Sequence, residues 1–286
     1  MFKPVDFESK EEISKILNGY KNISYELCFG NLFVWSGAEN TEYYIREGIL
    51  YLRNNAGYYF PVNAGDNKKA VEYILSLDKN IKFIYLLKEQ AEFLREHFNF
   101  KIVERRDKSE YIYEAEKLRT FAGRKLHGKK NHLNKFYLSY SGRYKYENID
   151  SHNICECLQL SWKWRQMNQI YLNDSMIEEL DIVKKHIENY DKLDLLGGCI
   201  KIDGEIKAFT IGERAFKGSD CVIIHVEKAD YEEIEGIYPA ICSMFLQANP
   251  EFNLVNREDD LGDEGLRQSK LSYRPLYLLD RFETEL

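Results

Sequence analysis

Hydrophobic positions in the first half of the chain predict short strands alternating with amphipathic helices. Residues 42–53 have the pattern of two strands joined by a turn near Glu47 and Gly48. Residues 67–77 place apolar side chains at helical spacing, which predicts a helix with one buried face. The remaining predicted elements are strands at 58–62, 81–87, 100–103 and 110–114, and a short helix at 89–97.

The second half shows the same kinds of pattern. Residues 195–215 are predicted to form a hairpin, because Asp203-Gly204 is a strong two-residue turn signal between apolar stretches. The other predicted elements are helices at 152–167, 176–191 and 237–248, strands at 221–226, 252–256 and 275–282, and a short helix within 260–273.

Both halves therefore run in the order hairpin, strand, helix, strand, helix, strand. This order is that of the GNAT acyltransferase fold, and it predicts an α/β (α+β) protein of two tandem GNAT-like repeats, with mixed central sheets flanked by helices. We expect an N-terminal repeat at 1–120, a basic connecting helix at 121–145 and a C-terminal repeat at 146–286. No Pro/Ser-rich linker separates the repeats, so we expect them to pack together.

Composition favours a globular protein in a reducing compartment. The 286 residues are 44% hydrophobic, which is enough to build a core. Apolar runs are short of the roughly 18 residues that a transmembrane segment requires. The first residues do not have the pattern of a signal peptide, and the six cysteines include no CxxC pair, so we expect reduced thiols and a cytoplasmic location.

Charge is segregated along the chain. Residues 117–145 hold nine Lys and Arg and no Asp or Glu, whereas the whole chain is at −7, so the rest sums to −16. Such segregation indicates binding of an anion, although a solvated basic face paired with acidic surface elsewhere is the alternative. The candidate residues for binding the phosphates of an anionic donor are Arg124, Lys125, Lys129, Lys130, Asn131 and Lys135.

One apolar stripe runs through this basic segment. Its members step by three or four residues, as on the buried face of a single helix, and Thr120 is a candidate N-cap. Gly123 and Gly128 each disfavour a helix by about 1 kcal/mol, so they mark close approach of a phosphate, a kink or an interruption. The stripe consists of Leu118, Ala122, Leu126, Lys129, Leu133 and Phe136.

Acidic and basic residues also gather after the predicted strand at 252–256. We take Glu258, Asp260 and His225 as candidate catalytic residues, because acyl transfer requires a base for the acceptor. Arg267, Lys270 and Tyr273 are the candidate substrate-binding residues, since Arg267 and Lys270 share a helical face that could hold phosphate or carboxylate.

Structural roles compete with each of these assignments. Asp260 is suited to cap the following helix, with Asp263 in its first turn, and Arg267 and Lys270 to pair within that helix. His225 lies in an apolar strand, where a histidine is usually a satisfied core residue. The sequence shows neither a metal-ligand spacing nor a nucleophile triad, so we expect no metal site.

Two segments resemble a known family. They are residues 123–136, GRKLHGKKNHLNKF, and residues 260–275, whose core is Gly265-Leu266-Arg267-x-x-Lys270-x-x-Tyr273-x-Pro275. Both resemble motifs of bacterial domains related to the C-terminal catalytic domain of phosphatidylglycerol lysyltransferases, and the resemblance spans about residue 20 to the end. It implies a tandem GNAT-like fold and transfer of an aminoacyl group from charged tRNA. The membrane-spanning half of a lysyltransferase is absent from this sequence.

The favoured hypothesis is a GNAT-like acyl- or aminoacyltransferase that uses aminoacyl-tRNA as donor to an amine or hydroxyl acceptor. The basic segment would bind the anionic donor, either tRNA or a nucleotide-containing small molecule. One alternative is an acyl-CoA-dependent N-acyltransferase, although the loop at 227–239 offers a single glycine, Gly236, and five carboxylates that would repel a pyrophosphate. A non-catalytic module that binds RNA or another anion is the second alternative.

Overall fold

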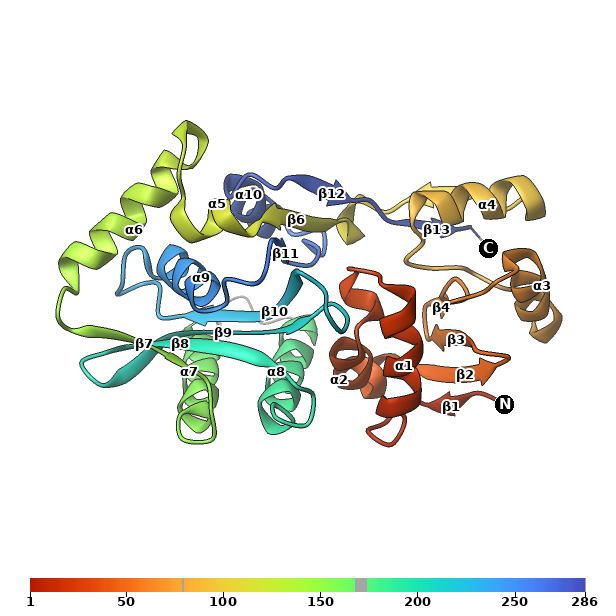
Figure 1. Cartoon of the computed structure of the whole chain (residues 1–286), viewed down its shortest axis with the longest axis horizontal. Coiled ribbons are helices and arrows are strands. Elements are labelled where there is room, and N and C mark those ends of the chain that lie inside the picture. Colours follow the sequence, from red (N-terminus) through yellow and green to blue (C-terminus); the bar gives the residue numbers. More distant parts are fainter. Residues whose placement is uncertain (79, 168–173, 286) are drawn as a thin grey trace.

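The computed structural model describes residues 1–78, 80–167 and 174–285, and shows two α/β halves side by side along the long axis (Figure 1). The first half carries a small antiparallel sheet, β1 to β4, with helices on both sides. Its elements are β1 (Lys3–Pro4), α1 (Lys10–Tyr20), α2 (Phe29–Glu39), β2 (Glu42–Arg46), β3 (Ile49–Asn54), β4 (Gly57–Tyr58), α3 (Asn67–Leu77), α4 (Lys88–Phe98) and β5 (Ile102–Glu104).

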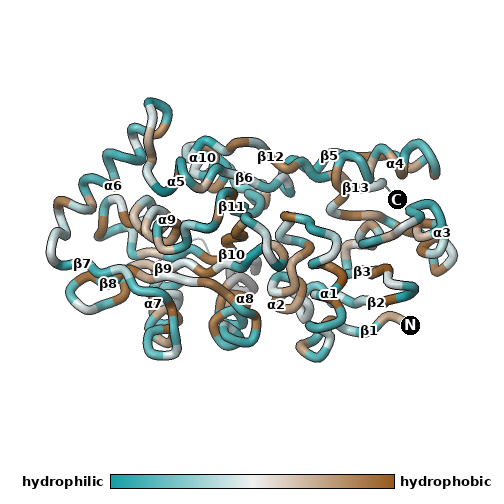
Figure 2. Tube along the Cα trace, in the orientation of Figure 1, coloured by the Kyte–Doolittle hydropathy of each residue, from teal (hydrophilic) through white to brown (hydrophobic). Residues whose placement is uncertain are grey.

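The second half is built on a large mixed sheet of order β12-β6-β11-β10-β9-β8-β7. Its apolar centre follows β10 through the middle of the molecule (Figure 2). The elements are β6 (Glu110–Glu114), α5 (Ala115–Thr120), α6 (His127–Ser139), β7 (Tyr144–Asn148), α7 (Ile154–Met167), α8 (Asp174–Glu188), β8 (Leu196–Ile202), β9 (Glu205–Arg214), β10 (Cys221–Ala229), α9 (Ile237–Ala248), β11 (Leu254–Asn256), α10 (Glu264–Ser272), β12 (Tyr277–Leu279) and β13 (Phe282–Thr284).

The two halves repeat one topology. Each has an antiparallel hairpin, β2–β3 or β8–β9, followed by a third strand and a helix. The chain then returns parallel to the third strand: β11 pairs with β10, and Phe83 forms a parallel bridge to Tyr58 of β4. Mixed sheets flanked by helices confirm the predicted α/β class, and the repeated order agrees with the element order found in the sequence.

The halves exchange one strand each. β6, which follows the last elements of the first half along the chain, lies between β11 and β12 in the large sheet of the second half. In return β13, the last strand of the chain, pairs with β5, and its Phe282 bridges to Leu86. Strand pairing therefore crosses the boundary predicted at residue 120, because β6 completes a sheet that belongs to the second half.

The basic segment is not one helix. α5 ends at Thr120, Phe121 and Gly123 have φ of 47° and 98°, and a 3-10 turn at Arg124–Leu126 precedes α6. The predicted N-cap role of Thr120 is therefore wrong, because its hydroxyl closes α5 by donating to the carbonyl of Glu116. Much of the predicted stripe is nevertheless buried, namely Leu118, Leu126, Leu133 and Phe136, whereas Ala122 is exposed.

Two further elements differ from the prediction. Residues 81–87 are not a regular strand, since Tyr85 has φ of 54° and interrupts the extended backbone between bridges at Phe83 and Leu86. The strand predicted at 275–282 is split into β12 and β13, which pair in different sheets. Both differences come from the exchange, because the chain must leave one sheet before it enters the other.

A close glycine contact fixes α6 to the second half. Gly236 precedes α9 with φ of 83°, and a Cβ at this position would lie 2.1 Å from the carbonyl oxygen of His132 in α6. Only glycine combines this backbone conformation with so close an approach. Leu133 and Phe136 of α6 pack into the same core as Ile237 of α9.

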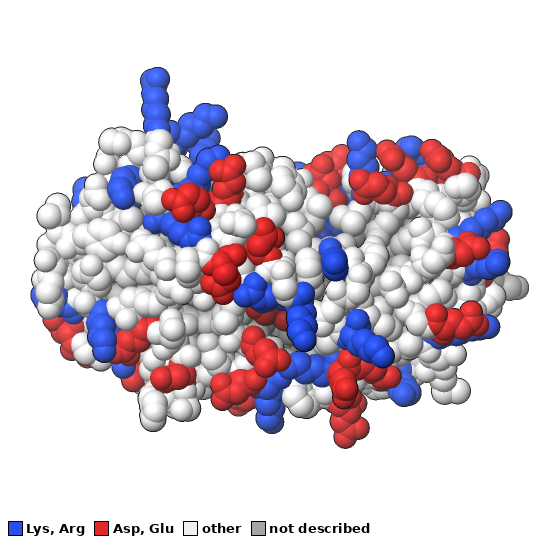
Figure 3. All heavy atoms as spheres, viewed as in Figure 1, with Lys and Arg blue, Asp and Glu red and all other residues white. Residues whose placement is uncertain are grey.

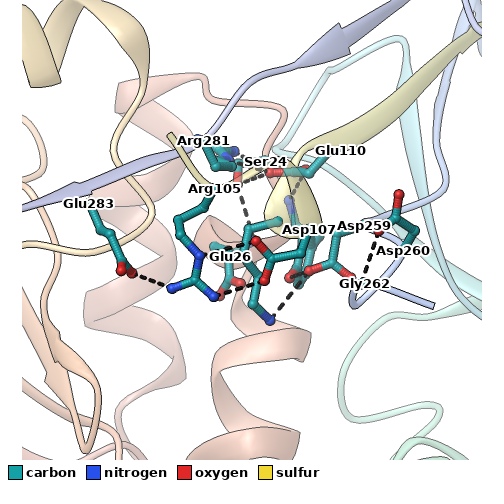
Figure 4. Close-up of polar contacts among 12 residues, drawn as sticks. Ser24, Glu26, Arg105, Asp107, Glu110, Asp259, Asp260, Gly262, Arg281 and Glu283 are labelled. Atoms are coloured by element: carbon teal, nitrogen blue, oxygen red, sulfur yellow. Dashed lines mark hydrogen bonds and ion pairs between the residues drawn. The ribbon is translucent and has the colours of Figure 1, made fainter. Parts of the chain in front are cut away.

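An ion pair joins the exchanged strands. Glu110 begins β6 and is fully buried, and Arg281 precedes β13 and is 2% exposed. The Arg281 guanidinium donates two hydrogen bonds to one Glu110 oxygen, to which the Ser24 hydroxyl also donates at 2.8 Å (Figure 4). The other oxygen accepts from the backbone N–H of Tyr25, at 3.0 Å, and from the amide of Asn256.

We expect Arg281→Met to lower the free energy of unfolding by about 3–5 kcal/mol, because it leaves the Glu110 carboxylate buried without its counter-charge. Adding Glu110→Gln should restore part of the loss, because the second substitution removes the stranded charge. Urea denaturation of the unchanged protein, Arg281→Met and the double variant measures how the two substitutions together affect the free energy of unfolding. Lys184→Met, which breaks a surface pair with Glu188, is the control and should change stability by less than about 1 kcal/mol. Equal stability of Arg281→Met and the control would contradict the role of the pair.

Candidate functional site

Two parallel strands of the large sheet separate and leave a hollow between them. β10 and β11 pair over residues 221–223 and 254–256, after which β10 continues beside β9 to Ala229 with a register shift between Ile224 and Val226. Side chains of α9 close the hollow on one side. It is lined by Thr210, Ile224, Glu227, Cys242, Phe245, Leu246, Val255 and Arg257.

Positive charge is in excess at this hollow. Arg257 donates a hydrogen bond to Glu227 at 2.7 Å, while its Nη1 is buried and has no hydrogen-bond partner among the described residues. The Arg257 guanidinium and the Lys129 ammonium lie 4.7 and 3.9 Å from the centre of the Tyr273 ring. Burial and the charge of Arg257 lower the pKa of Lys129. The two cations, Lys129 and Arg257, are thus accompanied by one carboxylate, that of Glu227. The site is therefore suited to bind an anion or a carbonyl oxygen.

Of the six residues predicted to bind phosphate, Lys129 is the one near the hollow: it contacts Tyr273 and interacts electrostatically with Arg257 and Glu227, which line it. Arg124, Lys125 and Asn131 are exposed, and Lys130 is half-buried. Lys135 is engaged by Glu235 at 2.8 Å. Basic side chains protrude into solvent at the top left of Figure 3, where α5 and α6 meet. The basic surface is therefore open at the start of α6 and partly neutralised further along.

The predicted catalytic residues His225 and Glu258 are in contact. Nδ1 of His225 lies 2.7 Å from a Glu258 oxygen, and its Nε2 lies 3.0 Å from Glu213. Burial opposes the charged imidazole, but hydrogen bonds to Glu213 and Glu258 prevail and raise the pKa of His225 to about 9. The side chain of His225 is 2% exposed, so it is enclosed between two carboxylates rather than open to a substrate. Its catalytic role stays a prediction.

Asp260 has the contacts of a structural carboxylate. It accepts hydrogen bonds from Arg267 at 2.9 and 3.0 Å, from the Tyr111 hydroxyl at 2.6 Å and from Arg106 at 3.1 Å. Burial opposes its ionisation, yet Arg267 and Tyr111 hold the pKa of Asp260 well below its usual range. Asp263 rather than Asp260 caps α10, by accepting from the N–H of Leu266, because Asp260 is held at β6 by Tyr111.

Lys270 positions the wall of the hollow. Its ammonium donates to the carbonyl oxygens of Arg257, at 2.6 Å, and of Asp259. Burial lowers the pKa of this amine to about 8. Arg267 and Lys270 therefore brace the backbone of residues 257–260, while the third predicted substrate-binding residue, Tyr273, contacts the two cations of the hollow.

Arg257 and Glu227 were not predicted as site residues. Glu227 is one of the five carboxylates that the sequence places in the loop at 227–239, and in the folded chain it pairs with Arg257. Arg257 stands directly before the acidic run at 258–260. The signal that could have found it is its position at the end of a predicted strand, where side chains of a parallel pair face the sheet edge.

Among the described residues, no helix combines the length and the apolar character required to cross a bilayer.

Comparisons with known proteins agree with this architecture. A solved structure of a conserved protein of unknown function from Bacteroides thetaiotaomicron VPI-5482 is 29% identical with a TM-score of 0.92, over 99% of this chain and 98% of that one. The structure of L-PGS from Bacillus licheniformis is similar in fold, with 14% identity, a TM-score of 0.67, and 96% and 91% of the two chains covered.

A relative known from its sequence is an uncharacterized protein of Mycoplasmoides gallisepticum. It is 26% identical over 213 residues, which are 71% of this chain and 65% of the relative, so the match spans just under two thirds of that protein. The family described as phosphatidylglycerol lysyltransferase, C-terminal, matches residues 18–283 of this chain. The chain therefore belongs to the phosphatidylglycerol lysyltransferase C-terminal family.

Proposed function

We propose that this protein transfers an aminoacyl group from aminoacyl-tRNA to an amine or hydroxyl acceptor, with the reaction at the hollow between β10 and β11. The observation that carries the proposal is the excess positive charge there, with Lys129 and Arg257 facing the single carboxylate of Glu227. Attack on an ester carbonyl develops negative charge on its oxygen, and fixed cationic donors stabilise that charge.

The contacts of Arg257 suit it to the oxyanion. Glu227 fixes one side of its guanidinium, Lys270 fixes its backbone carbonyl, and Nη1 is left free to donate among the described residues. The acceptor nitrogen or oxygen forms a bond to the carbonyl carbon, and the ester bond to the ribose oxygen breaks. The proton lost by the acceptor passes to that ribose oxygen, so the transfer needs no further reactant.

The open basic surface favours tRNA over coenzyme A as the source of the acyl group. Arg124 and Lys125 are exposed at the start of α6, where a polyanion has access. The loop before α9 keeps exposed carboxylates at Glu232 and Glu233, which disfavour a pyrophosphate at that place. The same basic surface also supports the second candidate, a module that binds RNA without catalysing transfer.

The deciding experiment is equilibrium binding of labelled, mixed aminoacyl-tRNA at two salt concentrations, with uncharged tRNA and excess CoA as competitors. The proposal expects salt-sensitive binding that prefers charged tRNA and is unaffected by CoA. Equal affinity for charged and uncharged tRNA, without transfer to any acceptor supplied, would favour the non-catalytic module. Displacement by CoA would favour an acyl-CoA donor.

The exposed cations at the start of α6 should set the salt dependence of tRNA binding. For Arg124→Ala with Lys125→Ala, we expect the slope of log affinity against log salt to become shallower by about 1.5 to 2, because each phosphate contact contributes nearly one unit. The matched control removes two exposed lysines elsewhere, Lys68→Ala with Lys184→Ala, and should keep the slope of the unchanged protein. An unaltered slope in the first variant would remove this surface from the tRNA site.

Lys129→Met should affect transfer much more than binding. Loss of one donor to the developing oxyanion lowers the rate by about 100- to 1,000-fold, while a single contact fewer leaves tRNA affinity within about threefold. The rate is measured with labelled aminoacyl-tRNA and two separate acceptors, phosphatidylglycerol vesicles and an amine-bearing peptide. Lys135→Met, on the same helix but paired with Glu235, is the control. Equal rates for the two variants would exclude Lys129 from the reaction.

A further inference from the structure

A cysteine, a glutamate and a histidine meet where the start of α2 packs on the large sheet. Cys28 directly precedes α2, Glu213 lies in β9 and His225 lies in β10. The Cys28 sulfur, a Glu213 oxygen and a ring nitrogen of His225 lie within 4.8 Å of one another. Sulfur, nitrogen and oxygen atoms from three elements, all largely buried, are donors that zinc accepts, and they leave one of four tetrahedral positions for a water.

The hydrogen bonds made by these side chains resemble those that orient metal ligands in known metal sites. The Nδ1 of His225 is held by Glu258 at 2.7 Å, which leaves Nε2 toward Glu213. A metal-binding histidine commonly donates its other N–H to a carboxylate in this way. The second oxygen of Glu213 accepts from the N–H of Gly30 at 3.4 Å, and a Cβ at Gly30 would lie 2.4 Å from Glu213.

An independent observation comes from His186 of α8. Its ring stacks on that of His225, with centres 5.0 Å apart. Nδ1 of His186 lies 2.9 Å from the carbonyl of Ile182 and donates to it, so Nε2 carries a lone pair. That nitrogen is buried and has no hydrogen-bond partner within the described part of the chain. A buried acceptor without a donor is costly, and a water bound to a metal ion beside His225 would supply the donor.

The charges of the cluster permit a metal ion to replace protons. With a neutral Cys28 thiol and a protonated His225, the two carboxylates of Glu213 and Glu258 bring the cluster to −1. With a thiolate, a neutral His225 and a divalent ion, the sum is again −1. The thiol now donates to the carbonyl of Tyr25 at 3.0 Å, a contact that ionisation would release. Metal binding therefore releases protons, because the thiol and the imidazole bind a metal in their deprotonated forms.

We propose that Cys28, Glu213 and His225 bind one divalent transition-metal ion of the zinc type, with a water in the fourth position and Glu258 orienting His225. The ion would join the first half, through Cys28, to the sheet of the second half. This site is separate from the Lys129–Arg257 hollow and does not depend on the proposed transfer reaction.

Cobalt titration of the full chain, freed of metal with a chelator and kept reduced, tests the proposal. We expect one equivalent of Co²⁺ to produce the thiolate-to-cobalt absorption band, and Zn²⁺ to displace it. Cys28→Ser should abolish the band, whereas Cys155→Ser, which alters an exposed cysteine, should retain it. Calorimetry in two buffers of different ionisation enthalpy should show that protons are released when Zn²⁺ binds. Absence of a saturable band, or its persistence in Cys28→Ser, would overturn the proposal.

A second variant separates loss of the site from loss of the fold. Glu213→Gln keeps the size of the side chain and one oxygen acceptor but removes the ligand charge, and it should weaken Zn²⁺ binding at least tenfold. Circular dichroism reports whether each variant is folded. Zn²⁺ should raise the unfolding temperature of the unchanged protein and of Cys155→Ser, and should raise that of folded Glu213→Gln by less at the same Zn²⁺ concentration. An equal rise in all three would contradict the assigned ligands.

Discussion

The buried ion pair between Glu110 and Arg281 is the contact on which the arrangement of both halves depends. Each residue stands at the start of an exchanged strand, so the pair forms only when β6 and β13 have both crossed. An isolated charge at either position would be strongly destabilising, which makes the two crossings energetically coupled. Ser24, Tyr25 and Asn256 complete the hydrogen bonds of Glu110 and are thereby fixed in place.

The geometry of the proposed reaction site depends on that contact. Asn256 ends β11 with its amide bound to Glu110 and to the carbonyl of Ile23, and its oxygen accepts from the N–H of Glu258. The backbone then turns, with Glu258 at φ of 54°, and Lys270 holds the carbonyls on either side. Arg257 is consequently directed to the hollow. The polar residues of the family-like motif at 260–275 act on the site largely by fixing this short segment.

What the sequence predicted was governed by local rules. The helices at 67–77 and 237–248 follow from apolar spacing, and the β8–β9 turn follows from Asp203-Gly204. The exchange of β6 and β13 depends on pairing between distant segments, which a local pattern does not encode. The apolar stripe at 118–136 suggested one continuous helix. The structure interrupts it because Phe121 ends α5 in a left-handed conformation, which a bulky side chain rarely adopts and which the apolar pattern does not predict. In the site, Lys129 and Tyr273 were assigned to separate roles, and only the tertiary fold, in which Tyr273 joins the core formed by α6 and α9, brings them together.

The two hollows of the duplicated topology differ in charge. In the first half, the residues that line the hollow include Tyr59, Tyr85, Glu26 and Arg281, and Arg281 is paired with Glu110. Burial raises the pKa of Glu26 well above its usual range, so this hollow favours a neutral acid, whereas Lys129 and Arg257 make the other one cationic. In the proposed reaction, an ester donor requires stabilisation of negative charge at its carbonyl oxygen, and the unpartnered Nη1 of Arg257 suits the second hollow to that role. One repeat thus suits the chemistry, while the other, tied to it through Glu110 and Arg281, holds the segments that shape the reaction site.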